Sequence, residues 1–218
     1  MMAENNASPV SGNVDEVEGR IQAVERLLRP DITKVRSLEA QLGKVAKNDF
    51  ILLTEPVAHA NIVNLALTKI MLDQGFDIIY VTFNRDSDTW NHEFKVLDLP
   101  PKRIAFVDAT TRNPRFSGMR PPFVISLEHS GDLMEIPDAI DAASEKLGPV
   151  KQCVILDSLS TLLIFNRSQT VEKFAHVLRN HLHERNMAGL VLAGHETSTR
   201  LVNIVAPFFD RVINLPRI

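Results

Sequence analysis

Residues Asp49–Leu67 read DFILLTEPVAHANIVNLAL, and this stretch decides how the whole chain is interpreted. Asp49–Thr54 is an apolar run of the kind that forms a buried strand. Apolar side chains recur at helical spacing over Ile62–Leu72, which predicts a helix. Between the two lie seven residues, EPVAHAN. The stretch therefore predicts a strand, a loop and a helix in direct succession.

The predicted loop has the position and length of a phosphate-binding loop but lacks its chemistry. A working loop follows the frame G-x-x-x-x-G-K-[ST], with glycines that let backbone N–H groups reach the phosphates, and a Lys and a hydroxyl for the phosphate oxygens and Mg²⁺. The residues at the four required places are Glu55, Ala60, Asn61 and Ile62. Each lost charge-assisted hydrogen bond is worth about 1.5–3 kcal/mol. An ordinary strand-loop-helix unit without any phosphate-binding history is the alternative on this segment alone.

Beyond this unit, predicted strands and helices alternate, which indicates a parallel sheet with helices on both faces. Four of the strand runs, ILLT, IIYVTF, CVILD and GLVLAG, are continuously apolar, as expected of strands that are covered on both sides. Predicted strands are Asp49–Thr54, Ile78–Thr82, Arg103–Asp108, Phe123–Ser126, Cys153–Asp157, Leu190–Ala193 and Arg211–Leu215. Predicted helices are Ala60–Gln74, Ser87–Leu97, Ile136–Lys146, Val171–Arg185 and Asn203–Phe209.

The chain before this α/β region has a different pattern. Residues 1–13 are small and polar, which predicts a disordered tail. Apolar residues at helical spacing predict two helices, Val14–Arg29 and Ile32–Ala46, so that residues 14–47 form a helical extension to a domain over residues 48–218. The apolar stripes of these helices suit docking on a partner or packing on the chain's own sheet.

Composition narrows the class of protein. The net charge of -3 and the pI near 6.2 give no overall attraction to nucleic acid or to an anionic membrane. Cys153 is the single cysteine and lies in an apolar run, so we expect a buried side chain and no disulfide within the chain. No leader-like start or membrane-length apolar stretch is present in the sequence, and we expect a cytoplasmic protein.

A second candidate nucleotide-binding residue follows a later strand. The strand Cys153–Asp157 ends in an acid, as does the strand that presents a carboxylate to Mg²⁺ in many parallel-sheet ATPases. A strand-final Asp that caps the following turn is the simpler explanation of this feature alone.

Longer motifs make a family resemblance specific. The run CVILDSLSTLLIFN, then a predicted helix, then MAGLVLAGHE and FFDRVINL, resembles the second half of RecA-superfamily ATPases of the KaiC type. The strand, loop and helix after Asp49, followed by Gly75 and YVTFNRD, resemble the first half. The chain is also similar to archaeal relatives of KaiC with an eroded phosphate loop and a similar T-x-N-R sequence. This resemblance spans about Asp49 to Leu215.

The resemblance implies a three-layer α/β RecA-like P-loop NTPase fold, with a central, mostly parallel sheet and an N-terminal helical extension. In KaiC-like ATPases, the second strand is followed by two glutamates, one of which activates water. Here those places hold Asn84 and Arg85. The implied vestigial nucleotide site comprises Glu55, His59, Asn61, Ile62, Asn84, Arg85 and Asp157. Asp157 alone is insufficient to hold Mg·ATP, whereas Arg85 is the residue best suited to an anion.

These changes predict a non-catalytic pseudo-ATPase that needs no cofactor or metal and acts as a regulatory or scaffold subunit. We expect a protein partner or self-association, weak or absent nucleotide binding, and no membrane contact. One alternative is a DNA-associated RecA paralogue, although the loop 194–200 offers one arginine, Arg200, and few aromatic side chains are present outside the Phe set. Another is an atypical nucleotide-binding enzyme, in which His195 and Glu196 join His59 and Asp157.

The longest stretch without periodicity is Ala109–Pro122, ATTRNPRFSGMRPP. It carries three arginines, Arg112, Arg115 and Arg120, which suit an anion or an acidic partner. A solvated loop with scattered charge is the alternative, and the general behaviour of polar loops favours it.

Overall fold

The computed structural model describes residues 32–55, 60–110, 121–127, 132–195, 197 and 199–215. Several predicted features lie outside these residues: the tail 1–13, the helix Val14–Arg29, His59, Glu196 and most of the Ala109–Pro122 loop.

The centre of the fold is a seven-stranded sheet in which every neighbouring pair is parallel. The strand order is β4-β3-β2-β5-β6-β1-β7. All the predicted strands are confirmed, with bounds that differ by two residues or fewer. The observed bounds are β1 Phe50–Glu55, β2 Asp77–Thr82, β3 Ile104–Asp108, β4 Val124–Ser126, β5 Gln152–Asp157, β6 Ala188–Gly194 and β7 Arg211–Asn214.

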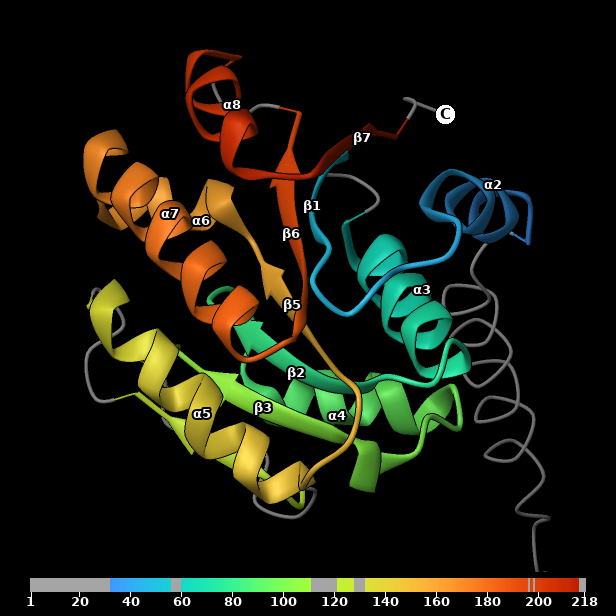
Figure 1. The fold of residues 1–218 in the computed structure, drawn as a ribbon. Helices are drawn as coiled ribbons and strands as arrows, with labels where there is room; N and C mark the ends of the chain where they lie inside the picture. Colours follow the sequence, from blue (N-terminus) through green and yellow to red (C-terminus); the bar gives the residue numbers. More distant parts are fainter. Residues whose placement is uncertain are drawn as a thin grey trace, which may run out of the picture.

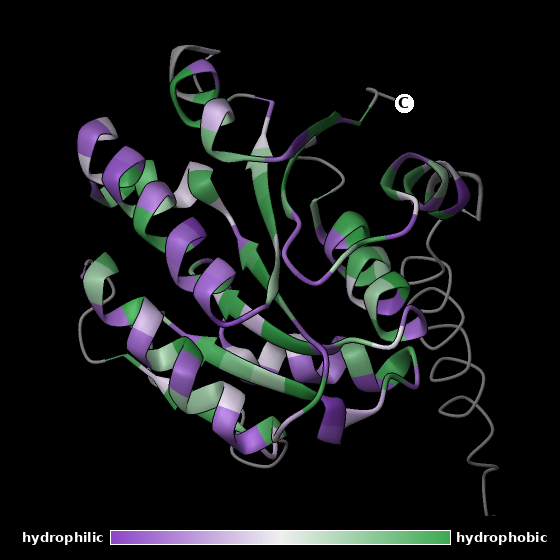
Figure 2. Ribbon diagram, in the orientation of Figure 1, coloured by the Kyte–Doolittle hydropathy of each residue, from purple (hydrophilic) through white to green (hydrophobic). Residues whose placement is uncertain are grey.

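Helices cover both faces of the sheet, which gives the expected three-layer α/β architecture (Figure 1). One face packs against α2 (Ile32–Leu42), α3 (Ala60–Asp73) and α4 (Ser87–Val96). The other packs against α5 (Ile136–Leu147), α6 (Leu159–Phe165), α7 (Ser168–Glu184) and α8 (Thr199–Val205). The hydropathy colouring in Figure 2 shows the strands and the inner sides of the helices as largely apolar. Short 3-10 turns cover Pro101–Arg103, Leu133–Glu135 and Ala206–Phe208.

Two helix predictions need correction, and one helix was not predicted. The helix expected over Ile32–Ala46 ends at Leu42, because Gly43 adopts φ +58, a left-handed conformation that terminates helices. The helix expected over Asn203–Phe209 is instead α8 followed by a 3-10 turn with Pro207 in its first positions. The α6 helix was not predicted, because its seven residues are too few to show helical periodicity.

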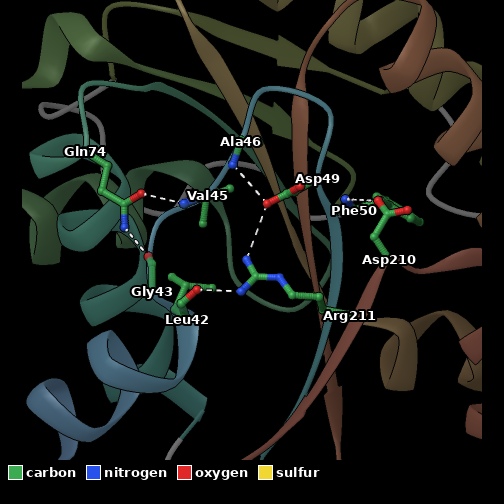
Figure 3. Close-up of polar contacts among 9 residues, drawn as sticks. All are labelled: Leu42, Gly43, Val45, Ala46, Asp49, Phe50, Gln74, Asp210 and Arg211. Atoms are coloured by element: carbon green, nitrogen blue, oxygen red, sulfur yellow. Dashed lines mark hydrogen bonds and ion pairs between the residues drawn. The ribbon is translucent and has the colours of Figure 1, made fainter.

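A polar cluster joins α2 to the sheet (Figure 3). Arg211 on β7 donates to the main-chain oxygen of Leu42 at 2.7 Å and pairs with Asp49 at 3.4 Å. Gln74, just past α3, donates to the main-chain oxygen of Gly43 at 2.8 Å. Together with the buried side chain of Leu42, these contacts make α2 part of the main core. Packing on the chain's own sheet, one of the two uses foreseen for the extension, is therefore confirmed for α2.

The chain order places a candidate ligand-binding crevice at the carboxyl ends of the central strands. After β2 the chain passes to α4 on one face, whereas after β5 it passes to α6 and α7 on the other face. Ligands of open α/β sheets bind at such switch points, outside the carboxyl ends of the strands. The residues that follow β1, β2, β5 and β6 at this edge therefore define the region where a functional site is expected. Among the described helices, none has the length and apolarity required to cross a bilayer.

Candidate functional site

Two acids predicted for the nucleotide site lie at the ends of separate strands and on the same face of the sheet. Glu55 is the last residue of β1 and Asp157 the last of β5. The residues two positions earlier, Leu53 and Ile155, pack in the core that contains α3 and α4. Because strand side chains alternate between faces, Glu55 and Asp157 also point toward that layer. Both are almost fully buried, at 2% and 4% exposure.

Two further residues complete what we call the edge cluster: Glu55, Asn64, Tyr80 and Asp157. The hydroxyl of Tyr80 on β2 donates to Asp157 Oδ2 at 3.2 Å. Asn64 on α3 is buried, and its side-chain amide lies near Asp157. The cluster therefore combines one helix with three strands that are brought together only by the sheet order.

The electrostatics of the cluster distinguish its two acids. Burial, and then the charge of Asp157, raise the pKa of Glu55 to about 8. Burial also raises the pKa of Asp157, but the Asn64 amide and the Tyr80 hydroxyl favour its ionised form. Glu55 therefore carries a proton at neutral pH, and Asp157 is the member of the pair better able to hold a negative charge.

The cluster contains unusually many unpaired polar atoms. Glu55 Oε2 and both polar side-chain atoms of Asn64 are buried without a hydrogen-bond partner. Asn64 is close enough to Asp157 to favour its ionised form, although the Asn64 amide makes no hydrogen bond of ordinary geometry. Buried polar atoms in proteins are nearly always hydrogen-bonded, to protein or to ordered water. These atoms therefore indicate a place that a small polar species would complete.

Arg85 is the cation closest to this region, and its side chain is engaged with α4. The guanidinium forms an ion pair with Glu93 and lies over the ring of Trp90, 4.7 Å from the centroid. Trp90 is itself fully buried in the core. Arg85 Nη1 has no partner, so the prediction that Arg85 binds an anion stays open.

Asn84 occupies the place at which the KaiC-like ATPases that the sequence resembles have a glutamate. Its side chain belongs to a network of hydroxyl groups at the carboxyl ends of the strands. The Oδ1 atom of Asn84 accepts a hydrogen bond of 2.7 Å from Thr161 Oγ1, and Thr161 Oγ1 lies 3.3 Å from Ser158 Oγ. Ser160 Oγ accepts from the backbone N–H of Gly194 at 2.7 Å. The polar residues of the DSLST segment thus connect the ends of β2, β5 and β6. The peptide bond between Asp157 and Ser158 is cis.

The remaining predicted site residues are not gathered in the edge cluster. Asn61 is exposed and Ile62 half-buried in the first turn of α3, and His59 lies outside the described residues. His195 follows β6, and its backbone N–H donates to the main-chain oxygen of Glu55 at 2.7 Å. Within the part of the chain that the structure covers, no group of three His, Cys, Asp or Glu side chains is placed to hold a metal ion.

Sequence reasoning missed Asn64 and Tyr80. Two signals were available: Asn64 is a polar residue in the mostly apolar helix ANIVNLALTKIMLD, and Tyr80 is the chain's single tyrosine, set in a buried strand. Neither signal shows that Asn64 and Tyr80 lie next to Asp157, because that proximity depends on the order of the strands in the sheet.

Comparisons with known proteins agree with the fold. The profile of a family of unknown function, DUF7504, matches residues 51–215. The chain belongs to this family. No curated protein matches this DUF7504 member.

Two similar solved structures come from Pyrococcus horikoshii. The first is the uncharacterized protein PH0321, solved in complex with an unknown peptide; identity is 15%, coverage is 82% of each chain and the TM-score is 0.62. The second is the KaiC-like protein PH0186 from strain OT3; identity is 10%, coverage is 77% of this chain and 70% of that chain, and the TM-score is 0.54. At such identities the likeness shows the fold alone, and it confirms the expected RecA/KaiC-like architecture.

Proposed function

We propose that this DUF7504 protein is a non-catalytic, KaiC-like pseudo-ATPase that acts as a regulatory or scaffold subunit through contacts with another protein. The observation that carries the proposal is Glu55: a buried acid stands where a phosphate loop needs its first glycine, and it is close enough to Asp157 for the two carboxyl groups to interact electrostatically. A cytoplasmic location and an archaeal type of KaiC relative are further parts of the proposal.

The residues at the site do not fit Mg·ATP. A phosphate group at the end of β1 would meet the carboxyl of Glu55 instead of a cradle of backbone N–H groups. Asn61 replaces the lysine that would neutralise phosphate charge, and Ile62 replaces the hydroxyl that would bind Mg²⁺. Among the described residues, Asp157 is the one acid at a position from which ATPases of this fold bind Mg²⁺. A single carboxylate is not enough, because the substrate phosphates and water supply most of the other ligands of the metal.

The hydrolytic step also lacks a base. Asn84 has no proton-accepting group in the relevant pKa range, and its side-chain oxygen is used by Thr161. Arg85, the next residue, pairs with Glu93. We therefore propose that the protein does not hydrolyse ATP.

Two observations support a protein partner. Ile164 and Phe165, at the end of α6, are exposed by 74% and 67%, and large apolar side chains grouped on a surface are typical of contact sites. The structurally similar PH0321 was solved in complex with an unknown peptide, so a protein of this fold holds peptide. We favour a protein or a second copy of the chain over DNA, because the described carboxyl edge offers few cations.

Thermal unfolding of the full chain with Mg·ATP, Mg·ADP or no nucleotide tests the proposal. All samples contain the same Mg²⁺ concentration, so that any effect of the metal alone cancels. A ligand at 100 times its Kd stabilises the folded state by about 2.7 kcal/mol, which is readily detected as a rise in Tm. We expect no change in Tm and no phosphate release. A saturable rise in Tm with Mg·ATP would instead support the atypical nucleotide-binding enzyme.

A further inference from the structure

The edge cluster presents oxygen atoms that have no partner of their own. Glu55 and Asn64 are 2% and 1% exposed, and Glu55 Oε2 and Asn64 Oδ1 are both unpaired. Asp157 lies near both residues and is 4% exposed. Tyr80 Oη is 3.2 Å from Asp157 Oδ2. Asp157 on β5 thus has a carboxyl, an amide and a hydroxyl group near it, from β1, α3 and β2 respectively.

The charge around these oxygens favours a cation over an anion. Glu55 and Asp157 belong to the cluster, and the charge of Arg85 offsets that of Asp157 only in part, because Arg85 also pairs with Glu93 on α4. A cation bound between the two acids displaces the proton of Glu55, and the resulting pair of carboxylates repels phosphate and carboxylate ligands. Asn64, a neutral residue from another element, adds an independent sign of a ligand because its amide oxygen is buried and unpaired.

We propose that Glu55, Asn64 and Asp157 form a nucleotide-independent site for a hard divalent cation such as Ca²⁺ or Mg²⁺. Hard cations prefer carboxylate and amide oxygens, which are the groups present here. The cation joins β1, α3 and β5 at the carboxyl edge and provides the partners that Glu55 and Asn64 lack. This site does not depend on the pseudo-ATPase proposal, since Glu55 and Asn64 are not residues that bind Mg·ATP in the phosphate-loop frame.

The chain is well suited to a direct binding experiment. Tyr80 and Trp90 are its single tyrosine and single tryptophan, and their ring centroids lie 5.1 Å apart. Tb³⁺ is a luminescent substitute for Ca²⁺ that takes oxygen ligands and emits when a nearby aromatic side chain is excited. Titration of the full chain with Tb³⁺, in the absence of nucleotide, reports binding next to Tyr80. We expect saturable emission that Ca²⁺ or Mg²⁺ competes away.

Three variants assign the site. Glu55→Gln has the shape of the protonated glutamate but cannot become a carboxylate. Asn64→Leu has about the volume of the asparagine side chain but lacks its oxygen. We expect both to weaken Tb³⁺ binding about tenfold or more. Asp73→Asn is the matched control on the same helix, because Asp73 is 64% exposed and pairs with Lys69. This control should bind Tb³⁺ as the unmodified chain does.

The result of the Tb³⁺ titration decides whether the proposed cation site exists. Emission that disappears in Glu55→Gln and Asn64→Leu but persists in Asp73→Asn supports it. Absence of saturable emission from the unmodified chain, or equal emission from all variants, would overturn it and leave ordered water as the partner of these atoms. Circular dichroism of each variant verifies folding, and the near-isosteric Glu55→Gln keeps the test decisive if Asn64→Leu fails to fold.

Discussion

Arg211 on the last strand donates a hydrogen bond of 2.7 Å to the main-chain oxygen of Leu42, the final residue of α2 (Figure 3). The two residues are 169 positions apart in the sequence. The bond satisfies one of the carbonyl groups that every helix leaves unpaired at its carboxyl end, and it places a cation where the helix dipole is negative. The far ends of the described chain are thus joined at one point.

We predict that Arg211→Ala loosens α2 from the sheet. The variant loses the bond to Leu42 and the pair with Asp49, and we expect stability to fall by about 1 kcal/mol. Hydrogen exchange should accelerate over residues 32–46 and change little in β2 and β5. Arg179→Ala is the control, because Arg179 is joined to Asp210 by a 3.5 Å surface contact. Equal exchange in the two variants would show that Arg211 does not hold α2.

We predict that Glu55 makes the protein less stable as pH rises. The pKa of Glu55 is about 8 in the folded protein and has its ordinary value of 4.5 in the unfolded chain, so the folded state holds one more proton between these values. The contribution of Glu55 to the unfolding free energy is complete below the lower value, declines by about 1.4 kcal/mol per pH unit between them, and is lost above the upper one.

Urea unfolding between about pH 5 and about pH 9, with a chelator present, measures this effect. Glu55→Gln cannot ionise, and its stability should therefore depend less on pH than that of the unmodified chain. Asp73→Asn removes an exposed acid from α3 and should leave the pH dependence unchanged. Parallel curves for Glu55→Gln and the unmodified chain would show that Glu55 ionises normally.

The five inner strands were predictable because each is buried on both faces and reads as a largely apolar run. The α6 helix was missed because its seven residues, LSTLLIF, are too few to show helical periodicity. Gly43 limited α2 through its left-handed backbone, and the sequence reading extended the helix beyond it.

The site was predictable only in part. Glu55 and Asp157 could be named because each occupies a place in a linear motif. Their proximity to Tyr80 and Asn64 could not, since it depends on strand order: β2 neighbours β5, and β6 alone separates β5 from β1. Periodicity shows which face of a strand is buried, but it does not show which strands are neighbours.

We predict that Gly189→Ala destabilises the sheet. A Cβ at this position would lie 2.5 Å from a ring carbon of Phe50 and 2.7 Å from a methyl of Leu182, well inside contact distance. Phe50 also stacks on Phe209, with centroids 4.4 Å apart, which restricts its movement. We expect a loss of about 1–3 kcal/mol in chemical unfolding.

A double-mutant cycle tests the cause of this loss. Leu182→Ala opens space beside Gly189, and on its own it should cost about 2–5 kcal/mol. If crowding is the mechanism, the double variant should be more stable than the sum of the single effects implies. If the two losses in stability simply add, the methyl group introduced by Gly189→Ala destabilises the protein by a mechanism other than crowding against Leu182.

Finally, we predict that Asn61→Lys combined with Ile62→Thr does not restore ATP hydrolysis. The two changes return the lysine and the hydroxyl of the phosphate-loop frame, but Glu55 still presents a buried carboxyl to the phosphates. Asn84 still cannot accept a proton from water, and Thr161 still donates to its oxygen. Phosphate release by the double variant should therefore equal that of the unmodified chain, whereas a third change, Glu55→Gly, should permit some ATP binding without turnover. Measurable turnover in the double variant would show that a base other than the residue at position 84 serves the reaction, and the proposal of a non-catalytic protein would fail.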